Sequence, residues 1–119
     1  MLDLSAATLD GKDGLVEALQ GVPEHRKLRG IRHPLASILS IATCATLAGA
    51  RSMAAVGEYA QDCPQEVLAR LGAKYHPEKK RYIAPHHDTI QRALSSVDTA
   101  ALDRAVGAWL YDQVVAGNL

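Results

Sequence analysis

The chain has 119 residues, of which 48% are hydrophobic, and its 13 basic side chains balance 13 acidic ones. This length is typical of one domain, and such a domain buries about two thirds of its unfolded surface without disulfides or metals. Two cysteines and 4% aromatic residues disfavour a disulfide-rich secreted scaffold and an all-β fold. We therefore expect a mainly α-helical protein with reduced thiols.

The longest uncharged stretch runs from His33 to Ala50, between two arginines. Its length is at the lower limit for crossing a bilayer, but its many Ala, Ser and Thr residues favour a buried core helix. No basic residue precedes an apolar run near the N-terminus, so we expect no secretory signal. These features predict a cytoplasmic protein without membrane contact.

Residues 1–13 are predicted to form an N-terminal tail, and residues 14–116 a small domain of about six helices. A short helix is expected over 13–20, followed by a basic loop over 24–33. Pro34 then occupies the first position of a long central helix that ends at Gly49. The apolar side chains of this helix recur at helical spacing: Leu35, Ile38, Leu39, Ala42, Ala45 and Ala48.

Two closely linked helices are expected next. Ser52 can cap the first, and Pro64 opens the second over 65–71, with Gly72 as its C-terminal stop. Such a closely spaced pair predicts a helix-turn-helix-like element. The buried stripe of the first helix is predicted to contain Met53, Val56, Gly57 and Ala60.

The helical signal is absent from residues 73–87, where a short β-hairpin or an ordered loop is expected. Asp88 can then cap a helix over 89–96, and Asp98 a final helix that ends near Gly117. The buried stripe of the first of these helices contains Ile90, Ala93, Leu94 and Val97. That of the final helix contains Leu102, Val106, Trp109, Leu110 and Val114.

The basic loop is the first candidate site, because four basic residues stand against one acidic residue within 24–33. Such a density of charge is stabilised by an anion, and the phosphate backbone is the common biological polyanion. The alternative is a solvated loop whose arginines pair with acidic helices. The candidate phosphate contacts are Arg26, Lys27, Arg29, Arg32 and His33.

The second candidate site is the segment over 74–82, in which basic residues alternate with Tyr75 and Tyr82. Its cations offer contacts to phosphates and its rings can lie against sugar or base. The alternative is an exposed hairpin whose tyrosines pack inward. The candidate DNA contacts here are Lys79, Lys80 and Arg81.

The helix over 89–96 is the candidate reader of sequence. Gln91 and Arg92 are side-chain types that reach adenine and guanine edges in a major groove, and Thr89 precedes them on the same helix. We expect this polar face to lie beside Lys79–Arg81. The alternative is an ordinary solvated helix face, because many exposed helices carry a Gln and an Arg.

The sequence predicts no metal, no cofactor and no catalytic group. His86 and His87 are adjacent, and adjacent side chains on an extended segment point in opposite directions, so we do not expect them to share an ion. Cys44 falls in the most apolar helix, where a thiol is inert. No pair of acids stands out from the surface charge.

Four segments together resemble the N-terminal region of the H-repeat-associated family of bacterial insertion-sequence transposases. They are P-E-H-R-K-L-R-G-I-R-H-P-L-A-S-I-L at 23–39, L-A-G-A-R-S at 47–52, T-I-Q-R-A-L at 89–94, and the terminal helix with Trp109. The resemblance covers about residues 14–111. The chain departs from the family pattern at His86 and His87, where Pro-Ser is usual, and at Gln91, where a second Arg is usual.

The resemblance implies a transposase-associated domain that precedes a catalytic domain of RNase H-like fold. No acid here matches the family's catalytic triad, so we expect a non-catalytic chain that stops where the catalytic domain would begin. Its expected partner is double-stranded DNA at transposon ends, on the bacterial nucleoid. The alternative is an interaction module through which a transposase forms homo-oligomers.

Overall fold

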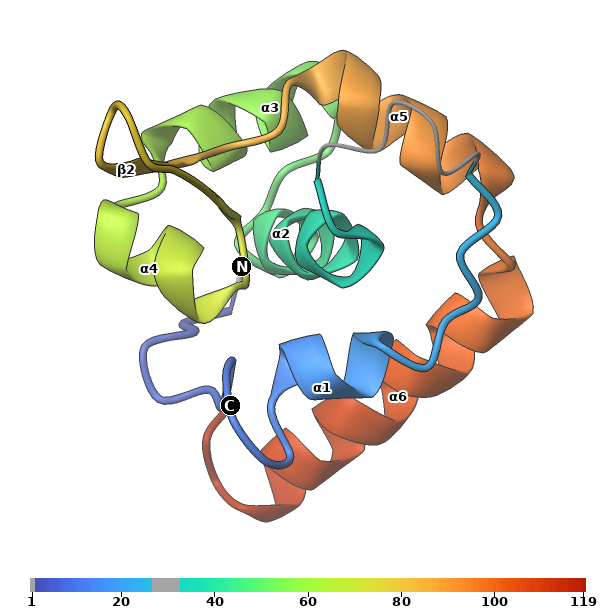
Figure 1. Ribbon diagram of the computed structural model, residues 1–119. Helices are drawn as coiled ribbons and strands as arrows, with labels where there is room; N and C mark the ends of the chain where they lie inside the picture. The colour runs from blue at the N-terminus through green and yellow to red at the C-terminus, as the bar shows by residue number, and fades with distance from the viewer. Residues whose placement is uncertain (1, 27–32) are drawn as a thin grey trace.

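The computed structural model describes residues 2–26 and 33–119. Within these ranges the chain forms six helices and one two-stranded antiparallel hairpin (Figure 1), which confirms the mainly α-helical prediction. The helices are α1 (Leu15–Leu19), α2 (Leu35–Leu47), α3 (Met53–Asp62), α4 (Gln65–Arg70), α5 (His87–Ser96) and α6 (Thr99–Val115). The strands are β1 (Lys74–His76) and β2 (Arg81–Ile83).

Helix α2 is the centre of the fold, and Figure 1 looks almost along its axis. Helices α1, α3 and α5 all pack against it. The predicted stripe is buried except for Ala48, which is partly exposed, but burial extends to further faces of the helix through Ser37, Ser40, Ile41 and Cys44. The hydroxyl of Ser40 donates to the carbonyl oxygen of Ala36 at 2.6 Å, so this buried polar group is satisfied within the helix.

Helix α6 lies along α1 and closes one side of the core. Trp109 is 2% exposed, as predicted, and its indole N–H donates to the carbonyl oxygen of Thr8 at 2.8 Å. The prediction for Val114 is wrong, because this side chain is 60% exposed. Twelve residues of α-helix turn about a third of a turn beyond three whole turns, which carries Val114 out of the stripe that begins at Leu102.

Gln113, and not Val114, is buried on the inner face of α6. Its side-chain oxygen accepts hydrogen bonds from the backbone N–H of Thr8 at 2.9 Å and from the amide of Asn118 at 3.1 Å. The segment over 2–13, expected to be a tail, thus contacts α6 and contributes the buried side chains of Ala7 and Leu9 to the core.

Helix caps show where local sequence decides structure. Ser52 and Asp98 cap α3 and α6 as predicted, accepting from the N–H groups of Ala55 at 3.1 Å and Ala101 at 3.0 Å. The predicted cap of α5 is wrong. This helix begins at His87, and Nδ1 of the preceding His86 accepts from the N–H of Asp88 at 3.1 Å. Asp88 lies instead in the first turn, where a carboxylate is favoured by the helix dipole.

Two further starting points also differ from expectation. Helix α1 is shorter than predicted, and Pro34 precedes the first residue of α2 instead of occupying that position.

Helix α3 packs against α2 and α5, whereas α4 packs against β2. The two helices therefore have different packing partners. That they pack together as a helix-turn-helix pair stays a prediction. No helix in the described part of the chain has both the length and the apolar character needed to cross a bilayer.

Candidate nucleic-acid interface

The hairpin predicted over 73–87 is present and carries three of its basic residues at or next to the connecting turn. Tyr75 pairs with Tyr82, and His76 with Arg81, so residues 77–80 form the connecting turn. Lys80 adopts a positive φ of 51°, and the N–H of Lys79 donates to Nδ1 of His76 at 3.1 Å. The predicted DNA contacts Lys79, Lys80 and Arg81 are therefore adjacent and exposed.

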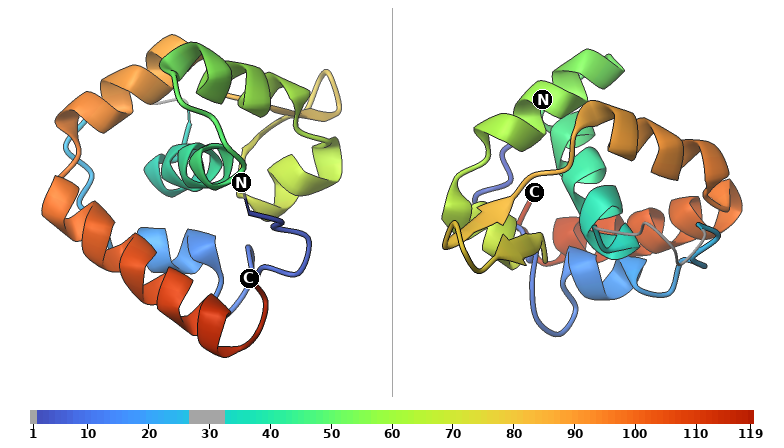
Figure 2. Two further views of the ribbon diagram at one scale, coloured as in Figure 1. Left: turned by 180° about the vertical axis from the view of Figure 1, so that it is seen from behind. Right: turned by 45° about the horizontal axis from the view of Figure 1, so that its top comes forward.

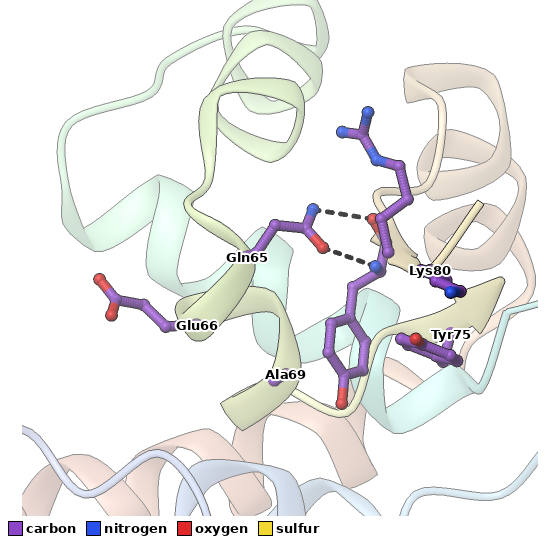
Figure 3. Close-up of a pocket in the computed structure, with 7 residues that line it drawn as sticks. Gln65, Glu66, Ala69, Tyr75 and Lys80 are labelled. Carbon is purple, nitrogen blue, oxygen red and sulfur yellow. Dashed lines mark hydrogen bonds between the residues drawn. The ribbon is translucent and has the colours of Figure 1, made fainter. Parts of the chain in front are cut away.

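Gln65 fixes this hairpin to the start of α4 (Figure 3). Its side-chain oxygen accepts from the N–H of Tyr82 at 2.6 Å, and its amide donates to the carbonyl oxygen of the same residue at 3.0 Å. A side-chain amide that satisfies both backbone groups of a strand residue acts as an additional strand partner. Sequence analysis missed Gln65, because nothing in a single glutamine indicates a partner 17 residues away.

The two tyrosines of the hairpin contact each other edge to face, with ring centroids 5.1 Å apart. Tyr82 packs against the core, whereas Tyr75 stays 47% exposed. Both rings line an open groove of about 580 Å³ together with Ala69 and Lys80 (Figure 3). The alternative expectation of two inward-facing tyrosines thus describes Tyr82 and not Tyr75.

In the first basic segment the structure describes Arg26 and His33, whereas the candidates Lys27, Arg29 and Arg32 lie outside the described residues. The Arg26 guanidinium forms an ion pair of 2.7 Å with Glu24 and donates to the carbonyl oxygen of His33 at 2.8 Å. This arginine pairs with an acid of its own loop and not, as the alternative interpretation expects, with an acidic helix. The ion pair also keeps the pKa of Glu24 below its ordinary value, through the hydrogen bonds from Arg26.

The electrostatics of His33 connect the two basic segments. Burial lowers the pKa of its imidazole, and the nearby positive charges of Lys74 and Arg26 lower it further. Lys74 begins the hairpin and Arg26 belongs to the first basic segment, so positive charges separated by more than forty residues in the sequence both act on His33, just before α2. The first turn of α2 carries no acidic residue and has no side-chain cap, so the helix dipole adds to this positive region.

Helix α5 turns its polar face to solvent, as predicted. Ile90 and Ala93 are buried, while Gln91 and Arg92 are exposed and Thr89 is partly exposed. The helix starts close to α3, because a Cβ added to Gly57 would lie 2.6 Å from the Cβ of His87.

The hairpin and the polar face of α5 occupy different parts of the molecule. The hairpin packs on α4, whereas α5 packs on α2 and α3, and both views of Figure 2 show α5 running away from the hairpin. The structure does not bring Gln91 and Arg92 beside Lys79–Arg81. The expectation that they are neighbours fails because α5, although it follows β2 closely in sequence, points in another direction.

His86 and His87 lie side by side, with ring centroids 4.1 Å apart. The expectation that they point in opposite directions is wrong, because His86 caps α5 and His87 already belongs to its first turn. Nδ1 of each ring lies near a carboxylate oxygen of Asp88, at 3.6 Å and 3.3 Å. These three exposed residues have ligand atoms within 4.8 Å of one another and could hold an ion, but capping already accounts for their arrangement.

Comparison with known proteins identifies the family. The family model described as DDE_Tnp_1-associated matches residues 16–110, a range that spans α1 to most of α6 and includes the hairpin, α5 and the described basic residues. No curated protein matches the chain, and no solved structure does. The chain belongs to the DDE_Tnp_1-associated family, the transposase-associated domain of the DDE transposases.

Proposed function

We propose that this chain is a non-catalytic DNA-binding module of a DDE transposase and that it contacts the transposon ends. The observation that carries the proposal is the run of three adjacent exposed cations, Lys79, Lys80 and Arg81, on a hairpin that Gln65 holds against α4. Near the start of α2, the positive charges of Lys74 and Arg26 also act on His33 and lower the pKa of its imidazole. Adjacent cations on one exposed element can follow a phosphate backbone.

The hairpin supplies the phosphate contacts in this proposal. Lys79, Lys80 and Arg81 are exposed, and no ion pair among the described residues includes them. Their charges are therefore available to replace counterions on DNA. The two hydrogen bonds between Gln65 and Tyr82 hold the hairpin in one position on α4, which favours a fixed register on the duplex.

Arg26 has a different role in the proposal. Its guanidinium is occupied by Glu24 and by the carbonyl oxygen of His33, so it positions the backbone before α2 instead of contacting phosphate. Gln91 and Arg92 on α5 are proposed to read base edges at a position separate from the hairpin.

Salt-dependent binding to duplex DNA tests the phosphate contacts. Lys79→Ala, Lys80→Ala and Arg81→Ala should each weaken binding to all sequences alike and reduce the salt slope by about one unit. Lys12→Ala, an exposed cation in the loop before α1, is the matched control and should leave the slope unchanged. Wild-type slopes in all three hairpin variants would reject the hairpin as the DNA contact.

Specificity is tested separately on the terminal repeat of the element and on a scrambled duplex at one salt concentration. Gln91→Ala and Arg92→Ala should each reduce discrimination by about 1–3 kcal/mol while nonspecific affinity is kept. If both variants keep the wild-type ratio of affinities, α5 is not the reader. With Mg²⁺ and supercoiled DNA, we expect no cleavage by the chain, since none of its acidic residues matches the catalytic triad of the family.

A further inference from the structure

The outer face of α6 is unusually apolar for a surface. Tyr111, Val114 and Val115 are 70%, 60% and 69% exposed. They lie within five residues of one helix and exceed the exposure of the other large apolar side chains on the described surface, Leu2 and Tyr75. Gly107 and Ala108, one turn before them, are also exposed. Contiguous apolar residues of this kind typically mark an interaction site.

Asp112 lies beside this patch and Arg104 lies about one turn before it, and neither has a partner along the helix. Arg104 and Asp112 are both exposed. On a helix, an ion pair joins positions three or four residues apart, and at these distances both residues meet only uncharged side chains. No ion pair among the described residues includes either one.

We propose that the outer face of α6 binds the same face of a second copy of this chain, with the two helices antiparallel. In a two-fold arrangement a residue of one copy contacts a second residue of the other, and the reverse contact also forms. When the pair is centred between Ala108 and Tyr111, Arg104 of each copy lies within about one turn of the partner's Asp112. Two symmetry-related ion pairs then form, and each of the four charges has one partner.

The same charges exclude the parallel arrangement. Parallel helices in register would place Arg104 beside Arg104 and Asp112 beside Asp112, and the repulsion between like charges in contact opposes association. The antiparallel pair also places Tyr111 of one copy against Ala108 of the other, and the small Gly107 and Ala108 allow the two helices to approach closely. Charge pattern and side-chain size therefore favour the same arrangement.

A charge-reversal experiment on the full chain tests this dimer by analytical ultracentrifugation over a range of concentrations. Arg104→Asp and Asp112→Arg alone should each raise the dissociation constant of the dimer at least about tenfold, because each places like charges together. The double variant should restore wild-type association, since it exchanges the two charges. An equimolar mixture of the two single variants should form a heterodimer with wild-type affinity.

Glu58→Arg is the matched control, because Glu58 is exposed on α3, a helix that packs against α2 and α5. It should change the dissociation constant by less than threefold. Circular dichroism of every variant should show the wild-type helix content, since all these side chains are exposed. A wild-type chain that stays monomeric at millimolar concentration overturns the proposal, as does a dimer that the single reversals leave intact. None of these measurements needs DNA, so they stand or fall independently of the DNA-binding function.

Discussion

Helices α2 and α6 are the two longest elements of the fold, and they use their apolar residues in opposite ways. Helix α2 has no charged residue and is surrounded by α1, α3 and α5, so even Ser40 and Cys44 are buried. Helix α6 buries one face, with Trp109 at its centre, and exposes Tyr111, Val114 and Val115. The difference shows that apolar content alone does not indicate burial, because the number of packing neighbours decides it.

The largest expected effect is on the inner face of α6. Trp109→Ala should lower the free energy of unfolding by about 3–5 kcal/mol, because it leaves a cavity and removes the hydrogen bond to Thr8. Urea denaturation followed by circular dichroism measures this change. Tyr111→Ala, an aromatic truncation two residues further on, is the control and should cost far less. A loss below about 1 kcal/mol for Trp109→Ala would contradict the assignment of this face to the core.

The next prediction concerns the breadth of burial around α2. Ile41 lies outside the predicted stripe but is fully buried, so Ile41→Ala should destabilise the protein by about 2–5 kcal/mol. Thr46→Ala is the control on the same helix, because Thr46 is exposed and its hydroxyl only returns to the carbonyl oxygen of Ala42. Equal stabilities of the two variants would show that α2 has a solvated side after all.

The same contrast explains what could be predicted from sequence. Apolar periodicity and helix-breaking residues indicated all six helices and most of the predicted stripes, though not Val114, and capping chemistry placed Ser52 and Asp98 correctly, because these signals are local. The burial of Ile41 on another face of α2 depends on the three helices that surround α2. The burial of Gln113 on α6 depends on the segment near Thr8. The residue pattern of a single helix does not indicate which distant segments pack against it.

The candidate site divides in the same way. The basic residues and the exposed polar face of α5 were predictable from composition and spacing. The approach of Lys74 to His33 and the attachment of the hairpin by Gln65 were not, because they join segments far apart in the chain. The expected proximity of α5 to the hairpin was wrong for a related reason: closeness in sequence does not fix the direction in which a helix leaves a turn.

Alkaline pH provides a probe of the region packed around α2. Burial raises the pKa of the Cys44 thiol to about 12 and that of Cys63 to about 11, from an ordinary value of 9.0. The unfolded chain therefore loses these protons before the folded chain does, so stability is complete below about pH 9 and falls as the pH rises towards 11. Urea midpoints measured across this range should decrease.

The double variant Cys44→Ala, Cys63→Ala is the control for this pH dependence. It should be less stable at neutral pH but lose less stability between about pH 9 and 10, before the partly buried Tyr59 begins to contribute. The pKa of Tyr59 is raised to about 12, chiefly by burial. An unchanged pH dependence in the double variant would mean that the thiols are solvated in the folded protein.

The smallest effect is expected on the outer face of α6. Val114→Ala should change the free energy of unfolding by less than about 0.5 kcal/mol, because this side chain is 60% exposed and fills no space in the core. The free energy of unfolding should be measured at low micromolar protein concentration, where the proposed dimer is dissociated. At higher concentration, binding of a second copy would add stability that depends on concentration. At millimolar concentration the same substitution should lower the melting temperature relative to the wild-type chain. A loss above about 1 kcal/mol in the dilute protein would show that Val114 is buried within one chain, and the contrast between the two faces of α6 would fail.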